Sequence, residues 1–182
     1  MATIQVPTKP RRATPSNGAA LFEILDGRKV EVHVSAWEIS LANFLAARIR
    51  ESLGQPPHGE PFVEMLFRMR PTVRKDRRPD LAFVSYERWP DRKVPRDPEA
   101  WEMVPDLAVE IVSKNNSAEE IQEKVKEYLA CGVKEVWVVY PRARQILVYK
   151  TAKEARVLDE DDLLEGGEIL PGFSLRVRDL LD

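Results

Sequence analysis

The stretch PDLAVEIVSKNNSAEEIQEKVKEY, residues 105–128, predicts a strand followed by a helix. Alternate side chains of a strand share one face, so Leu107, Val109 and Ile111 point away from Glu110. The neighbours that share the face of Glu110 are apolar as well. Because an isolated buried carboxylate is costly, we expect Glu110 to be paired, protonated or bound to a metal ion. The alternatives are an edge strand with a solvated second face, or a structural ion pair.

Strand and helix patterns continue on both sides of this stretch. The predicted strands are a hairpin at 21–32 that turns at Asp26 and Gly27, and single strands at 62–69, 80–85, 107–113, 134–140, 145–150 and 155–160. The predicted helices are 37–53, capped by Ser35, 118–132, capped by Ser117, and a short amphipathic helix at 175–182. This order predicts an α/β fold, with a mixed β-sheet core flanked by helices.

The composition of the 182-residue chain, 43% hydrophobic and 32% charged, is typical of one globular domain. Residues 1–18 predict a disordered tail, and residues 19–182 a single domain. No apolar run has membrane-spanning length and the N-terminus lacks the apolar core of a signal peptide, so we expect a cytoplasmic protein without membrane contact. Cys131, His33 and His58 are too few for a zinc cluster. A net charge of −2 argues against non-specific coating of nucleic acid.

A second carboxylate, Asp80, stands at the head of the apolar strand DLAFVS, thirty residues before Glu110. Two carboxylates at neighbouring strand positions can converge on a hard cation such as Mg²⁺ or Mn²⁺. Such an ion activates water and stabilises the charge that develops on a phosphate. Pro-Asp pairs are common at turns, so Asp80 indicates a metal site only in combination with Glu110.

The chain resembles the Uma-type restriction endonuclease family, a branch of the PD-(D/E)XK nuclease superfamily. The resemblance is carried by RRPDLAFVSYERWP, then VPDLAVEIVS, then a helix with the pattern K-x-x-x-Y, then GVKEVW, in this order. FEILDGRKVEV resembles the opening hairpin of the family, so the resemblance runs from Phe22 to the end of the chain.

This resemblance implies a restriction-endonuclease-like core and a Mg²⁺- or Mn²⁺-dependent endodeoxyribonuclease that hydrolyses phosphodiester bonds of DNA. Asp80 and Glu110 match the two acidic metal ligands of the family. The glutamate before the hairpin turn of the family matches Glu23. Glu64, in the apolar run FVEMLF, is a further candidate, and either glutamate could complete the site or face solvent.

The superfamily usually carries a lysine two positions after the second acid, and here that position is Val112. On the following helix, Lys124 lies about 60° from Ile121, at the edge of the apolar stripe, and can lean toward the sheet. The resemblance implies that this helix supplies the missing lysine, with Tyr128 one turn further. The alternative is a surface lysine paired with Glu120.

The run RMRPTVRKDRR, residues 68–78, contains six basic residues and leads directly into Asp80. Basic side chains there can hold DNA phosphates beside the cut site. The candidate DNA-binding residues are Arg74, Lys75, Arg77 and Arg78. The alternative is a solvated loop.

The polar segment 85–105 is long for a plain connector and is a candidate functional loop. Trp89 and Trp101 flank it and could stack on a base or close a homodimer, although packing in the core is favoured. Two functions stay open. One is a metal-dependent DNA endonuclease with Asp80, Glu110 and Lys124 as catalytic residues. The other is a non-catalytic nucleic-acid-binding or assembly module that retains the nuclease fold. Three polar residues at otherwise apolar positions favour the endonuclease.

Overall fold

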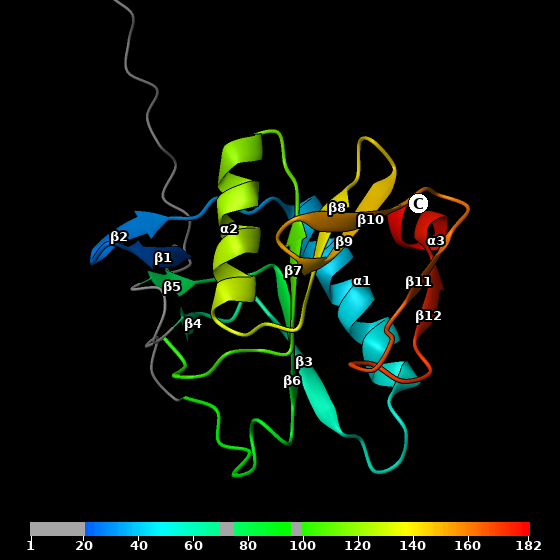
Figure 1. The fold of residues 1–182 in the computed structure, drawn as a ribbon, viewed down its shortest axis with the longest axis horizontal. Helices are drawn as coiled ribbons and strands as arrows, with labels where there is room; N and C mark the ends of the chain where they lie inside the picture. The colour runs from blue at the N-terminus through cyan, green and yellow to red at the C-terminus, as the bar shows by residue number, and fades with distance from the viewer. Residues whose placement is uncertain (1–20, 70–74, 96–99) are drawn as a thin grey trace, which may run out of the picture.

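The centre of the fold is a six-stranded mixed sheet, seen nearly edge-on in Figure 1. A computed structural model describes residues 21–69, 75–95 and 100–182, so the predicted tail and Arg74 lie outside the described residues. The strand order is β10-β9-β8-β7-β6-β3. The strands are β3 (Gly59–Val63), β6 (Leu81–Ser85), β7 (Leu107–Ile111), β8 (Glu135–Tyr140), β9 (Gln145–Thr151) and β10 (Glu154–Leu158). Among the strands described in this sheet, only β7 and β8 pair in parallel, which confirms the predicted mixed sheet.

Two helices cover the opposite faces of this sheet, as Figure 1 shows. Helix α1 (Ala36–Ser52) lies on one face, and α2 (Ala118–Ala130) lies on the other. Ser35 and Ser117 each cap a helix and close a capping box, which confirms the predicted helix starts. Helix α2 is the crossover between β7 and β8, because parallel neighbours cannot be joined by a tight turn.

Strand β7 is buried on both faces, between β6 and β8. On the α1 side, Val109 belongs to a core with Leu45 and Ile49. On the α2 side, Ala108 belongs to a core with Val125. The edge-strand alternative for Glu110 is therefore wrong, and its carboxylate points into the layer between the sheet and α2.

A second, antiparallel sheet of four strands lies beside α2, in the order β2-β1-β5-β4. Its strands are β1 (Phe22–Leu25), β2 (Arg28–Glu31), β4 (Phe67–Met69) and β5 (Lys75–Arg77). The predicted hairpin is confirmed, with positive φ at Asp26 and Gly27. The prediction of one strand over 62–69 is wrong, because the chain leaves the large sheet at Glu64, which has φ 55°.

The C-terminal segment adds a small layer beyond α1. It comprises the strand pair β11 (Leu163–Glu165) and β12 (Ser174–Arg176) and the helix α3 (Val177–Leu181). Leu175 and Leu180 belong to the same core as Leu45 of α1. The predicted C-terminal helix, 175–182, therefore begins later than expected, at Val177, because Leu175 and Arg176 lie in β12.

The segment between β6 and β7 packs onto the sheet through its tryptophans. Trp89 and Trp101 are 3% and 6% exposed, and their ring centroids lie 5.5 and 5.2 Å from that of Phe62. Asp106 ties down the end of the segment by accepting a hydrogen bond from the backbone of Ser85 at 2.8 Å. Packing in the core, rather than base stacking, is thus the arrangement found for both tryptophans.

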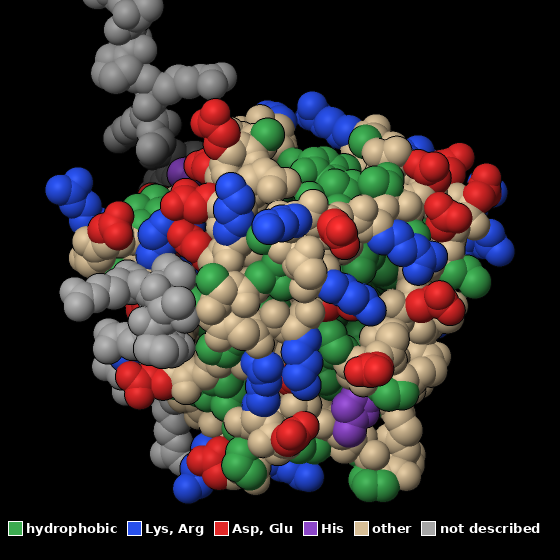
Figure 2. Space-filling view, in the orientation of Figure 1, with side chains coloured by type: hydrophobic (Ala, Val, Ile, Leu, Met, Phe, Trp, Pro, Cys, Tyr) green, Lys and Arg blue, Asp and Glu red, His purple; other side chains and the backbone are tan. Residues whose placement is uncertain are grey.

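Acidic and basic side chains are interspersed over the face seen in Figure 2, and no broad basic surface forms on it. No helix within the described ranges is both long and apolar enough to cross a membrane.

Candidate active site

Three carboxylates form a row across adjacent strands at one end of the large sheet. Leu81 pairs with Val109, so one step along the same antiparallel ladder places Asp80 beside Glu110. On the other side of Asp80, the backbone N–H of Glu64 donates to the carbonyl of Asp80 at 3.2 Å. The row therefore runs from Glu64 through Asp80 to Glu110, which brings the two predicted metal ligands together with a third acid.

Both carboxylate oxygens of Glu110 accept hydrogen bonds from α2. The Lys124 ammonium lies 2.8 Å from Oε2, and the Tyr128 hydroxyl donates to Oε1 at 2.6 Å. Lys124 and Tyr128 are one helical turn apart and so reach the same point of the sheet. The Glu110 side chain is only 5% exposed, and that of Lys124 12%. In the structure, Lys124 therefore points to the second acid and not to Glu120, which instead closes the capping box of α2.

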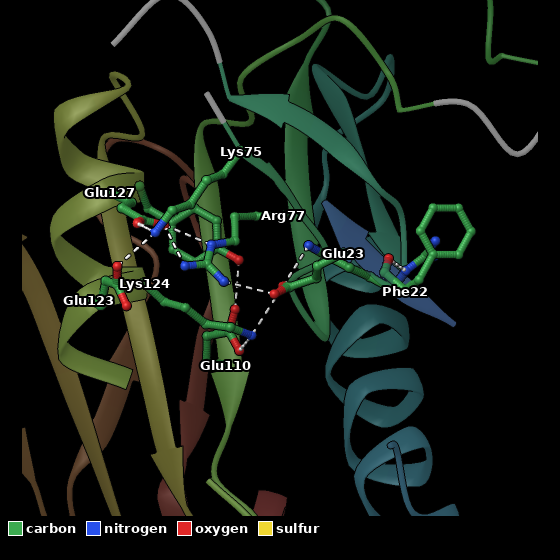
Figure 3. A network of polar contacts seen from close by, with 10 residues as sticks. Phe22, Glu23, Lys75, Arg77, Glu110, Glu123, Lys124 and Glu127 are labelled. Atoms are coloured by element: carbon green, nitrogen blue, oxygen red, sulfur yellow. Dashed lines mark hydrogen bonds and ion pairs between the residues drawn. The ribbon is translucent and has the colours of Figure 1, made fainter. Parts of the chain in front are cut away.

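Glu23 of β1 joins the same cluster from the second sheet (Figure 3). Its Oε1 lies 3.3 Å from the Lys124 ammonium, and its Oε2 accepts from the Arg77 guanidinium at 2.8 Å. The backbone N–H of Arg78 also donates to Oε1, at 3.0 Å. Glu23 therefore faces inward, and the sequence alternative of a solvated Glu23 does not hold.

The basic run ends in β5, which faces α2 and binds its acidic residues. Arg77 donates to Glu127 at 2.7 Å, and Lys75 lies 2.5 Å from Glu127 and 2.7 Å from Glu123, as Figure 3 shows. The Arg77 side chain is 5% exposed. Arg78 is partly buried and donates to the backbone carbonyls of Phe22, at 3.1 Å, and Glu64. These contacts place Arg77 in the supporting frame of the cluster, while contacts of this run with DNA stay a prediction.

Burial raises the pKa of each acid in the row, and the charge of Glu110 adds to the rise at Asp80 and Glu64. Burial, and then Glu110, raises the pKa of Asp80 well above its ordinary value. Burial also raises the pKa of Glu110, although Lys124 opposes this shift. The pKa of Glu64 rises to about 7, because burial and the charge of Glu110 outweigh the attraction of Arg78. The row therefore carries more negative charge than its protein partners neutralise, and it will favour protons or a cation.

The amine and phenol in the cluster keep their protons. Burial alone would lower the pKa of Lys124, but Glu110 and Glu23 outweigh it, and the net shift is upward. Burial and the charge of Glu110 raise the pKa of Tyr128 well above its ordinary value. By contrast, the pKa of Glu23 is lowered, because Lys124 and Arg77 outweigh its burial. At neutral pH the cluster thus contains a charged ammonium and a neutral phenol.

Glu64 provides a direct sign that a cation fits this site. Both of its carboxylate oxygens are buried, and neither has a hydrogen-bond partner among the described residues. Within 21–69, 75–95 and 100–182, no group of three or more His, Cys, Asp or Glu side chains is placed so that it could hold a metal ion. Mg²⁺, however, is commonly held by one or two carboxylates together with water and substrate phosphate. The pair Asp80 and Glu110, on neighbouring strands, fits that kind of site.

We predict that Glu64→Gln stabilises the metal-free protein at alkaline pH. The folded-state pKa of Glu64 is about 7 against a reference of 4.5, so the unfolded chain loses this proton first and stability falls as pH rises through that window. The shift corresponds to roughly 3 kcal/mol above pH 7. Urea unfolding at pH 5 and pH 8 in EDTA should show the variant gaining relative to wild type only at pH 8. Glu87→Gln, on the exposed surface, is the control, and an equal gain at both pH values would contradict the prediction.

Sequence reasoning missed the part that Glu127 plays in this site. Glu127 is on the same helix as Lys124, three residues further, and a spacing of three places two side chains on one face. This spacing is the sequence signal that could have identified Glu127 as part of the site. Arg77 was assigned to DNA, whereas its guanidinium joins Glu127 to Glu23 inside the protein.

Comparisons with known proteins identify the family and the fold of the chain. Residues 12–178 match the family Uma2, described as "Putative restriction endonuclease". A solved structure from Anabaena variabilis, described as a putative nuclease belonging to DUF820, superposes with a TM-score of 0.75. It shares 18% sequence identity, with 88% of this chain and 89% of that chain covered, and so shows a shared fold. No curated protein matches the chain.

Proposed function

The chain belongs to the Uma2 family of restriction endonuclease-like proteins, and from this membership we propose that it is a Mg²⁺- or Mn²⁺-dependent endodeoxyribonuclease. The observation that carries the proposal is the row of three acids with a buried lysine on its last member. Asp80 and Glu110 lie on neighbouring strands, and Lys124 contacts Glu110 at 2.8 Å. A row of this kind combines oxygen ligands for a hard cation with a fixed positive charge.

Asp80 and Glu110 would hold the divalent cation, and Glu64 is a further ligand. When bound, the cation supplies the charge that activates water and stabilises a phosphate during hydrolysis. The charge of Glu110 raises the pKa of Asp80 and of Glu64, and a bound cation would relieve this repulsion. Tyr128 and Lys124 hold the Glu110 carboxylate in one orientation.

Lys124 acts as a cation in this proposal and not as a base. Its pKa is raised, so the amine stays protonated at neutral pH and can only donate hydrogen bonds. A fixed ammonium beside the carboxylates can orient a water molecule or phosphate oxygen and stabilise negative charge as it develops. Glu23, anchored by Arg77, keeps the ammonium in place from the side opposite Glu110.

DNA contacts from the basic run are part of the same proposal. Arg74, which lies outside the described residues, precedes Lys75 and Arg78, and both of these are only partly buried. Arg77 is enclosed by Glu23 and Glu127, so we propose that it positions Glu23 and leaves phosphate contacts to the other three.

We expect the purified protein to bind Mg²⁺ or Mn²⁺, and Glu110→Gln to weaken binding about tenfold or more. The amide keeps the size of the carboxylate but removes its charge and one acceptor oxygen. Isothermal titration calorimetry on both proteins measures the difference. Glu119→Gln, on the exposed side of α2, is the matched control. Equal affinity of wild type and Glu110→Gln would remove Glu110 from the metal site.

One observation favours the alternative of a non-catalytic nucleic-acid-binding module. Both oxygens of Glu110 already bind groups of the protein, Lys124 and Tyr128. A cation would have to share an oxygen with one of them. Nicking of supercoiled DNA with and without Mg²⁺ separates the two functions, because a binding module retains DNA without producing the nicked form.

A further inference from the structure

Two adjoining clefts lead from the lysine of the site to the surface. The first has a volume of about 470 Å³ and is lined by Glu23, Arg77 and Lys124 at its inner end. The second has a volume of about 490 Å³ and is lined by Trp37 and Lys114. The two share three lining residues, namely His33, Ser113 and Asn115. They therefore form one continuous groove along the loop that follows β7.

The two clefts differ in charge. Glu23 is held by Arg77 and Lys124, and Glu123 by Lys75. Two other acids of the lining, Glu38 and Glu120, accept backbone N–H groups in the capping boxes of α1 and α2. The inner cleft is therefore acidic, with four glutamates against Arg77 and Lys124. The outer cleft has Glu38 against Lys114 and Arg142, and neither of these two cations makes an ion pair within the described part of the chain. The outer end of the groove thus offers two cations to an anionic ligand.

Trp37 adds a flat apolar surface beside these cations. It lies in the first turn of α1 and is 49% exposed, whereas Trp89, Trp101 and Trp137 are buried. An exposed indole beside two cations is a combination that binds single-stranded nucleic acid, since bases stack on the ring while basic side chains contact the phosphates.

We propose that the outer cleft of this groove binds an unpaired segment of DNA beside the active site. One base stacks on Trp37, and the adjoining phosphates contact Lys114 and Arg142. Each cleft has the volume of a small-ligand site, which is too narrow for a DNA duplex. The outer cleft therefore favours a single strand. This inference rests on the proposed nuclease function for its ligand.

Fluorescence anisotropy with a labelled 12-nucleotide strand, in EDTA to prevent cleavage, tests the stacking contact. The single strand should bind at least about tenfold more tightly than the blunt duplex of the same sequence. Trp37→Ala should weaken single-strand binding about tenfold, and Trp37→Phe should retain most of it, because a smaller ring still stacks. Tighter binding of the duplex, or no effect of Trp37→Ala in a protein with the wild-type melting temperature, would overturn the proposal.

The phosphate contacts are tested by salt dependence. Lys114→Gln with Arg142→Gln should reduce the slope of log affinity against log salt by about 1.4, since each phosphate contact on a single strand contributes about 0.7. Lys126→Gln with Lys153→Gln removes the same charge from exposed positions outside the groove and should leave the slope unchanged. Equal slopes for the two double variants would overturn the assignment. Tight single-strand binding without cleavage in Mg²⁺ would instead overturn the proposed endonuclease function, while the proposed single-strand binding would stand.

Discussion

Replacing Lys124 with alanine is expected to lower the rate of DNA cleavage by about 10²-fold or more, while metal binding is kept or strengthened. A positioned charge in a catalytic site typically contributes that much to the rate. The metal result has a separate cause. Lys124 neutralises Glu110 at 2.8 Å and Glu23 at 3.3 Å, so its loss leaves a more negative site that attracts a cation. Single-turnover cleavage of a labelled substrate and calorimetry with Mn²⁺ measure the two effects.

The matched control is Lys126→Ala, two residues along α2, where the side chain is exposed. Lys124→Met keeps the apolar stem and serves if the alanine variant folds poorly. Val112→Lys in the Lys124→Ala background places an amine two positions after Glu110, on the same strand face, and should restore part of the activity. Val112 lines the outer cleft, so the cleft provides space for the longer lysine side chain. Full activity of the single alanine variant would show that Lys124 is structural.

The sequence allowed the meeting of Lys124 with Glu110 to be expected because each position follows from a local period. A strand period of two placed Glu110 on the face with Ala108, and that face packs against α2. A helix period of 3.6 placed Lys124 at the edge of the apolar stripe, where the side chain can reach the sheet. Both periods follow from local backbone geometry, so they apply in the folded protein as they do along the sequence.

The position of Glu64 could not be predicted from a local period. Its apolar neighbours predict an uninterrupted strand, and glutamate is not a residue that normally marks a left-handed turn. The backbone adopts φ 55° there because the chain passes from β3 to β4, which belong to different sheets. Pairing with Asp80 and the contact with Arg78 hold this conformation, and both partners come from later in the sequence.

Strand β5 was even harder to predict from the sequence than the position of Glu64. Lys75, Asp76 and Arg77 have no apolar alternation, so the sequence indicated a basic segment for DNA and gave no sign of a strand. Pairing with β1 and β4 creates the strand, and acids of α2 and β1 supply the partners that allow Arg77 to be buried. A buried charge of this kind depends on tertiary contacts, which a local pattern does not contain.

Replacing Arg77 with methionine is expected to destabilise the protein by about 3–5 kcal/mol at pH 7, or roughly 10 °C in melting temperature. Arg77 is 5% exposed and binds Glu23 at 2.8 Å and Glu127 at 2.7 Å. Its loss leaves two buried carboxylates whose remaining cationic partners are Lys75 and Lys124. Arg142→Met, which removes an arginine from the wall of the outer cleft, should change stability by less than about 0.5 kcal/mol.

The pH dependence of the Arg77 effect identifies its electrostatic origin. The pKa of Glu23 is lowered in the folded protein, so its ion pairs contribute stability above the unfolded pKa of about 4.5 and lose it as pH falls through the lower folded value. Urea unfolding should therefore show a large loss for Arg77→Met at pH 7 that shrinks below about pH 4. Adding Glu23→Gln and Glu127→Gln to Arg77→Met removes the uncompensated charges and should recover much of the stability at pH 7. A loss that is constant with pH and unaffected by the two glutamine substitutions would mean that Arg77 stabilises the fold by packing, and that its charge does not hold Glu23 beside Lys124.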